Sequence, residues 1–116
     1  MDKIIIKDLL AHGIIGIYER EREKAQNILI NLTLYTDLTD AGKSDNYEDS
    51  INYAAVADRV KKHAETAQRL TVEALAQDIV DICLKDFGAA KVTVRVEKPS
   101  AIGYTQSVGI EMERSR

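Results

Sequence analysis

Apolar residues follow two different periods along the chain, and the order of these periods predicts the elements of the fold. Residues 2–18 are rich in isoleucine and carry Gly13 and Gly16, which indicates a strand that is interrupted before a turn. A charged segment, residues 19–24, connects it to "NILINLTLY", where every second residue is apolar. This period of two predicts a second strand that pairs with the first as a hairpin.

The central third of the chain changes to the period of a helix. Residues 39–50, "TDAGKSDNYEDS", show no sustained period and are rich in turn-forming residues, so we expect a loop there. Two helices should follow, one beginning at Tyr53 and one after Thr71, a suitable N-cap, with Gly88 at the end of the second. Their apolar stripes are Tyr53, Val56, Ala57, Val60, Ala64 and Ala67 in the first, and Val72, Leu75, Ala76, Ile79, Ile82, Cys83 and Phe87 in the second.

The last third returns to the period of two and completes a ββααββ order. Alternate apolar residues predict two more strands: Val92, Val94 and Val96, then Val108, Ile110 and Met112. Strands with one apolar face indicate an α+β fold with an antiparallel sheet, and both helices cover one face. Four strands in an open sheet leave two edges unpaired. Edge-to-edge pairing between subunits in a closed ring would cover them, so we expect a homo-oligomer.

Composition restricts the class of protein. A chain of 116 residues fits one compact domain, residues 1–116. Its formal net charge of -3, without a long run of one sign, argues against nucleic acid or anionic membranes as partners. The N-terminus matches neither a secretory signal nor a membrane span, and the lone Cys83 permits no intrachain disulfide. We therefore expect a cytoplasmic protein with Cys83 as a buried core thiol.

Few residues suggest chemistry by themselves. No ligand pair has the spacing of a metal site and no glycine motif fits a phosphate or dinucleotide, so we expect no metal and no cofactor. Each candidate also has an ordinary structural explanation. Glu73 suits the first turn of a helix, Tyr53 a core face, Glu21 a solvated charged connection, and Lys98 the polar end of a strand before Pro99.

Five segments in a characteristic order give these residues a common context. They are "IGIYEREREKAQ", "SDNYEDSINYAAV", "LTVEALAQDI", "VRVEKPSAI" and "SVGIEMERSR". Over nearly its whole length the chain resembles the dihydroneopterin aldolase family of folate biosynthesis. The resemblance implies the tunnelling fold, in which ββααββ subunits join edge to edge as a ring, commonly a tetramer, and two rings stack into an octamer with active sites between subunits.

The resemblance also implies a role for each candidate. Glu73 looks like the family's pterin anchor, with the backbone of Val72 against the same ring. Glu21 resembles the glutamate that contacts the substrate's hydroxylated side chain, and Tyr53 the tyrosine that reaches the substrate from the adjacent subunit. Lys98 matches the catalytic lysine. The implied reaction is retro-aldol cleavage of 7,8-dihydroneopterin into 6-hydroxymethyl-7,8-dihydropterin and glycolaldehyde, with Lys98 and Tyr53 handling protons, no Schiff base, no metal, and C2′ epimerisation as a side activity.

Two departures from the family pattern leave alternatives open. The segment after the lysine, "KPSAIGYTQSVG", is shorter than in many relatives, and Ile15 stands where many carry a histidine. One alternative is a dihydroneopterin triphosphate 2′-epimerase, which should need additional cations such as Arg20, Arg22 and Lys24. The other is a pterin-binding ring protein without catalysis, which the presence of all four candidate residues, Lys98 included, argues against.

Overall fold

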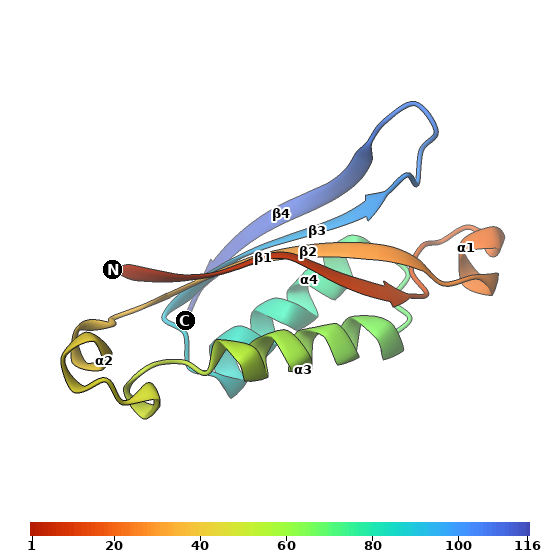
Figure 1. The fold of residues 1–116 in the computed structure, drawn as a ribbon. Helices are drawn as coiled ribbons and strands as arrows, with labels where there is room; N and C mark the ends of the chain where they lie inside the picture. The colour runs from red at the N-terminus through yellow and green to blue at the C-terminus, as the bar shows by residue number, and fades with distance from the viewer.

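Four antiparallel strands form one sheet, and two long helices cover one of its faces in the computed structural model, which describes residues 1–116 (Figure 1). The strands lie in the order β1-β2-β3-β4. Their bounds are β1 Asp2–Gly13, β2 Gln26–Thr36, β3 Lys91–Pro99 and β4 Ser107–Ser115. The two long helices are α3 Tyr53–Thr66 and α4 Val72–Asp81. The predicted α+β class and the ββααββ order are therefore confirmed.

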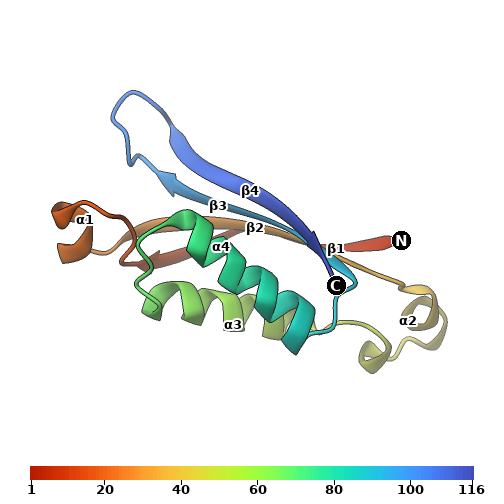
Figure 2. The ribbon, with the colours of Figure 1, turned by 180° about the vertical axis from the view of Figure 1, so that it is seen from behind.

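Shorter helices connect these elements. They are α1 Glu19–Glu23, α2 Thr39–Ser44, the 3-10 helix η1 Tyr47–Asp49 and the π-helical turn η2 Ile82–Asp86. In Figure 2, α4 crosses beneath β3 and β4 while α3 runs under β1, in agreement with the contacts between these elements. Strands β1 and β4 each have a partner on one side only, so the sheet has two open edges, as predicted.

The period of two places the apolar side chains of the central strands on the face beneath the helices. Leu32 of β2 pairs with Val94 of β3, and the pairs on either side of it in the register also join buried apolar residues. Between Ile6 and Leu9 a bulge shifts the register of β1. This bulge was not predicted, whereas the end of the strand at Gly13 agrees with the predicted stop at the glycines before the turn.

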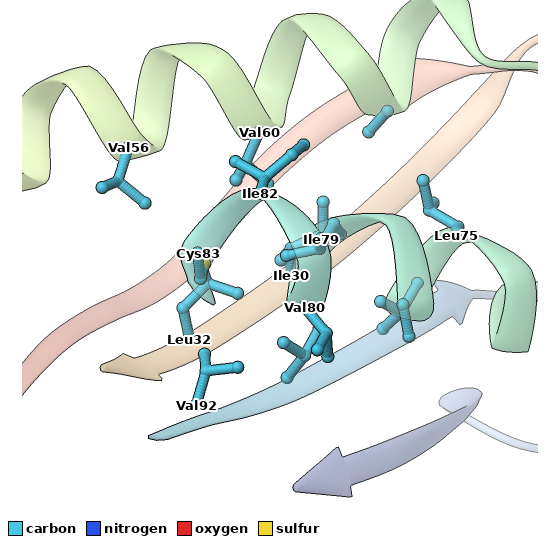
Figure 3. Packing of buried hydrophobic residues seen from close by; sticks show 14 of the residues in the cluster. Ile30, Leu32, Val56, Val60, Leu75, Ile79, Val80, Ile82, Cys83 and Val92 are labelled. Carbon is cyan, nitrogen blue, oxygen red and sulfur yellow. The ribbon is translucent and has the colours of Figure 1, made fainter. Parts of the chain in front are cut away.

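The core between sheet and helices contains 21 buried hydrophobic residues and no buried polar or charged residue (Figure 3). Helix α3 contributes Val56, Val60 and Ala64, whereas Tyr53 is 64% exposed. The prediction that Tyr53 belongs to the apolar stripe is wrong, because it stands at the first turn, beyond the part of α3 that packs on the sheet. Cys83 is fully buried, and burial raises the pKa of its thiol to about 12, which confirms a core thiol.

Capping residues explain where the second long helix begins and ends. The Thr71 hydroxyl accepts a hydrogen bond from the Ala74 N–H at 3.1 Å, which confirms the predicted N-cap. At the other end, Gly88 has a φ of +72°, which glycine adopts readily. The π-helical turn before it was not predicted. Such a turn holds one more residue than an α-helical turn, and Leu84 joins Ile82 and Cys83 in the core.

The prediction of a structureless loop over residues 39–50 is wrong, because α2 and η1 occupy most of it. Local side-chain bonds stabilise these single turns. Asp37 accepts a hydrogen bond from the Thr39 N–H at 2.9 Å, and Asn46 accepts one from the Glu48 N–H at 3.0 Å. Neither helix has a buried residue, so neither has an apolar period that the sequence could reveal. No helix in the fold is both long and apolar enough to cross a bilayer.

Candidate functional site

A cleft of about 600 Å³ opens at the end of the molecule where α1 and the β3–β4 connection project (Figure 1). Its lining comes from four separate segments of the chain. These are Tyr18, Arg20 and Glu21 at α1, Val72 and Glu73 at the start of α4, Lys98, Ala101, Ile102 and Tyr104 from β3 onward, and Val108, Gly109 and Ile110 of β4. Four of the five predicted site residues therefore meet in one cavity.

An ion pair joins two of them across the cleft. Lys98 Nζ donates a hydrogen bond to Glu21 Oε2 at 2.9 Å, although the residues are 77 positions apart. The side chains of Lys98 and Glu21 are only 19% and 11% exposed. Two charges with so little solvent around them require each other, because either one left alone would lose hydration without compensation.

Two further donors complete the environment of the Glu21 carboxylate. Gln26 Nε2 donates to Oε2 at 3.2 Å, and the Tyr18 N–H donates to Oε1 at 3.4 Å. Burial opposes ionisation of this carboxyl, but the hydrogen bonds from Lys98, Gln26 and Tyr18 outweigh it, so the pKa of Glu21 lies below its usual value. Glu21 is thus held as a carboxylate.

Strand geometry explains why Lys98 and Gln26 point to the same acid. Side chains in a strand alternate between faces, so Lys98 continues the inward row of Val92, Val94 and Val96, and Gln26 continues that of Ile28. Both therefore face the helix side of the sheet, at the end where the helical layer stops. An apolar residue would be exposed there, whereas a polar one can reach Glu21.

A glycine permits the close approach of α1 to this point. Gly16 has a φ of +123°, and a Cβ atom at this position would overlap the carboxylate of Glu21. Gly109 of β4 plays a similar part on the other wall, where a Cβ atom would overlap the Val96 carbonyl oxygen. Both positions need glycine for reasons of space.

Glu73 differs from Glu21 in having no partner. It is the second residue of α4, is exposed to the cleft, and its carboxylate accepts no hydrogen bond from the protein. The N-terminal end of a helix favours a negative charge through the unpaired N–H groups of its first turn. Together with the half-buried Val72 beside it, Glu73 offers an open acceptor to a ligand with paired N–H donors.

Tyr53 is the one predicted site residue that does not line the cleft. It begins α3, whereas the cleft is lined by residues at the start of α4. The start of α4 lies near the other end of α3 (Figure 1). A helix of 14 residues is about 20 Å long, so Tyr53 cannot reach the cleft of its own chain. Its predicted contact from an adjacent subunit remains a prediction.

Sequence reasoning missed several residues of the site. Gln26 and Tyr18, whose side-chain and backbone N–H groups contact Glu21, carry no sequence signal of a site role. Gly109 carried a usable signal, since a glycine inside an alternating strand often marks close approach of another group. Ile102 lies in a connection without a period, where no sequence signal locates a side chain; Tyr104, in the same connection, could be suspected of replacing a lost contact but could not be placed.

Comparison with known proteins agrees with this geometry. Residues 4–113 match the family model for FolB, dihydroneopterin aldolase. The chain belongs to the dihydroneopterin aldolase family. It is 42% identical over 115 residues to the folic acid synthesis protein FOL1 of Dictyostelium discoideum, an alignment that covers 99% of this chain and 18% of that protein.

Two further dihydroneopterin aldolases match over their full length or nearly so. The enzyme of Streptococcus pyogenes serotype M6 is 34% identical over 119 residues, and the alignment covers all of both chains. The crystal structure of Escherichia coli dihydroneopterin aldolase in complex with neopterin superposes with a TM-score of 0.96 at 30% identity, covering 99% of this chain and 100% of that one. The family and the enzyme class, an aldolase of folate biosynthesis, predicted from the five segments are confirmed.

Proposed function

We propose that this protein cleaves 7,8-dihydroneopterin into 6-hydroxymethyl-7,8-dihydropterin and glycolaldehyde. One observation carries the proposal: a single cleft contains an unpaired carboxylate, Glu73, and an enclosed ion pair, Lys98 with Glu21 at 2.9 Å. The first suits the recognition of a pterin ring, and the second suits proton transfer at the side chain of that ring. The Escherichia coli relative was solved in complex with neopterin, which supports a pterin as the ligand.

Recognition of the ring would depend on the start of α4. The 2-amino group and the adjacent ring N–H of a pterin form a pair of parallel donors, which one carboxylate can accept together. Glu73 has both oxygens free for this, and the backbone of Val72 would lie against the same edge of the ring. Apolar side chains in the cleft, among them Ile102 and Val108, would contact the faces of the ring.

Cleavage would take place at the Glu21 end. A base removes the proton of the side-chain hydroxyl while the carbon–carbon bond breaks, and the electron pair moves into the ring, which is protonated at N5. The resulting enamine then accepts a proton on its exocyclic carbon and N5 loses one, so that the second product leaves. Lys98, through an ordered water, and Tyr53 are the proposed proton carriers, and Glu21 would accept hydrogen bonds from the substrate's hydroxyl groups.

The ion pair favours this route over a Schiff base on Lys98. While the Glu21 carboxylate holds Lys98 as an ammonium, Lys98 can donate a proton but cannot attack a carbonyl; it would act as a base only after giving up a proton through the ordered water. The substrate's own protonated ring accepts the electrons, so the proposed reaction needs neither a lysine adduct nor a metal. Re-addition of glycolaldehyde to the opposite face before release would give C2′ epimerisation as a side reaction.

A complete site requires a second copy of the chain. Strands β1 and β4 are open edges, and pairing them between copies would form the tetrameric ring, two of which would stack as an octamer. Tyr53 stands at the opposite end of the 14-residue helix α3 from its own cleft and is 64% exposed, so a neighbouring chain would supply it. Mixing Lys98→Ala with Tyr53→Ala chains tests this arrangement: each variant should be inactive alone, and exchanged subunits should regain activity.

The positions of the three candidate cations, Arg20, Arg22 and Lys24, argue against the triphosphate epimerase. Of the three that the sequence offered, Arg22 donates to backbone carbonyls and Lys24 does not line the cleft. Only Arg20 faces the cleft, and it lies over the ring of Tyr18, 4.9 Å from its centroid. One arginine is a poor match for three phosphate groups.

Incubation with 7,8-dihydroneopterin and chromatography of glycolaldehyde test the proposed activity. Formation of glycolaldehyde and 6-hydroxymethyl-7,8-dihydropterin is expected. Turnover of dihydroneopterin triphosphate without glycolaldehyde would instead assign the epimerase, and binding of pterin without turnover of either compound would assign a non-catalytic protein.

A further inference from the structure

Arg22 lies next to Glu21 on α1 but makes its contacts away from the cleft. Its Nη1 donates to the carbonyl oxygens of Gly16 and Arg69, both at 3.1 Å, and its Nη2 donates to that of Gln68 at 2.8 Å. The planar fork of a guanidinium suits several acceptors at fixed positions, which a lysine ammonium cannot replace. Arg22 thus ties α1 to the segment between α3 and α4.

The accepting carbonyls are themselves held in place from α4. Arg69 donates through Nε and Nη2 to the two oxygens of Asp78, at 2.8 and 2.7 Å, and His63 lies 2.8 Å from the same carboxylate. The Asp78 side chain is 15% exposed, and hydrogen bonds from Arg69 and then His63 outweigh burial and hold the pKa of Asp78 below its usual value. Gln68 has a φ of +53°, an uncommon conformation that this bracing maintains.

Helix α1 needs such support because it has little of its own. It has five residues and no buried side chain, and an isolated helix of this length is not stable in water. The side chains of Glu19, Arg20 and Glu23 make no hydrogen bond or ion pair, and Arg20 lies over the neighbouring Tyr18 ring. Two side chains therefore attach α1 to the rest of the molecule: Glu21 toward the cleft and Arg22 toward the α3–α4 segment.

We propose that Arg22, braced by Asp78 through Arg69, is a positioning residue that holds α1 where Glu21 can pair with Lys98. Its kinetic consequence rests on the proposed aldolase function, whereas its effect on the Glu21–Lys98 pair does not. Arg22 is two contacts away from the reacting atoms, so it would act on turnover only through the placement of Glu21.

Arg22→Gln tests the proposal with a readout that does not depend on turnover. The pKa of the Glu21 carboxyl, followed by carbon-13 NMR, should rise toward that of an ordinary glutamate, because Lys98, Gln26 and the Tyr18 N–H would no longer all reach it. For the aldolase reaction, kcat should fall by up to about a hundredfold, the cost of a small misplacement of a reacting group. Affinity for a pterin without a side chain, held at Glu73, should stay unchanged.

Two further variants separate the fork from its charge. Arg22→Lys keeps the charge but cannot reach three carbonyls, so it should resemble Arg22→Gln. Asp78→Asn weakens the contact that holds Arg69, so it should raise the pKa of Glu21 and lower kcat by smaller amounts than Arg22→Gln. It replaces Arg22→Gln in the test if that variant does not fold. The matched control is Arg59→Gln, which removes an exposed pair with Asp86 at 3.8 Å and should change neither reading.

Two results would overturn the proposal. The first is a lower midpoint of thermal unfolding in Arg22→Gln with the pKa of Glu21 and kcat as in the wild type, since Arg22 would then only stabilise the fold. The second is full recovery of both readings in Arg22→Lys, since charge alone would then suffice. Absence of aldolase turnover in the wild type would refute the proposed function, while the titration of Glu21 would still test the role of Arg22.

Discussion

The core and the cleft share strand β3 but differ in the side chains that they contain: the core has only apolar ones, and the cleft has charged ones. Val92, Val94 and Val96 are fully buried in a core without any polar or charged residue, and two residues later the same inward row ends in Lys98, paired with Glu21. The core gains stability by excluding charge, whereas the cleft keeps two nearly buried charges at a cost in hydration. A function that needs both charges would explain why this cost is retained, and the proposed reaction is such a function.

Lys98→Ala should have the largest effect, and it falls on turnover. Removing a general acid or base usually costs about a hundredfold to ten-thousandfold in rate, whereas pterin affinity should change little because Glu73 is intact. Single-turnover kinetics and pterin titration measure the two quantities. Lys91→Ala is the matched control on the same strand, since Lys91 is outside the cleft; wild-type turnover in Lys98→Ala would refute the catalytic role.

Ile79→Ala should produce the converse result in the core. Ile79 is fully buried on α4, and the cavity left by its side chain should lower the free energy of unfolding by about 2–5 kcal/mol. At low temperature, where the variant is still folded, turnover should stay close to the wild-type value. Urea unfolding measures the first quantity, with the exposed Lys85→Ala as control; a large loss of turnover in folded Ile79→Ala would show that core and cleft are coupled.

Glu73→Ala should affect binding alone. Loss of an acceptor for two N–H donors should weaken pterin affinity by roughly a hundredfold or more, since hydrogen bonds to charged groups are worth about 1.5–3 kcal/mol each. Stability should hardly change, because the Glu73 carboxylate has no partner in the protein. Fluorescence titration with neopterin checks this, with Asp86→Ala as control. Unchanged affinity in Glu73→Ala would remove Glu73 from the pterin site.

The contrast between core and cleft also separates what the sequence could predict from what it could not. Alternation and helical periods indicate which side chains are buried. They were therefore sufficient to predict the buried valines of β3, up to Val96, and the apolar stripes of α3 and α4. A period cannot tell where the covering layer stops. Lys98 was identified as the end of a strand, but only the structure reveals that it continues the inward row and meets Glu21.

Family resemblance supplied the site where periodicity could not. Glu21, Val72, Glu73 and Lys98 had ordinary explanations when taken singly, and their order in five segments brought them together. The resemblance did not reveal Gln26 or Arg22, whose contacts depend on backbone positions. Nor did any pattern reveal α2 and η1, because turns held by local side-chain bonds need no apolar residues.

The smallest expected effect concerns the dependence of stability on pH. The pKa of Glu21 is lower in the folded protein than its ordinary value, so ionisation of this carboxyl favours folding. Its contribution is present above the pKa of the unfolded chain, about 4.3, and is lost as the pH falls through the lower folded-state pKa. Glu21→Gln should therefore be less stable than the wild type by about 1 kcal/mol at neutral pH.

This difference between wild type and Glu21→Gln should shrink as the pH falls below about 4, because the wild-type carboxyl is then itself protonated. Urea unfolding at a series of pH values measures it. Glu111→Gln provides the control, since Glu111 pairs with Arg95 at 3.1 Å on the surface with half of each side chain exposed, and such pairs contribute little. The prediction would be wrong if the difference in the free energy of unfolding stayed constant with pH. The enclosed Glu21–Lys98 pair would then contribute no more to stability than an exposed pair on the surface.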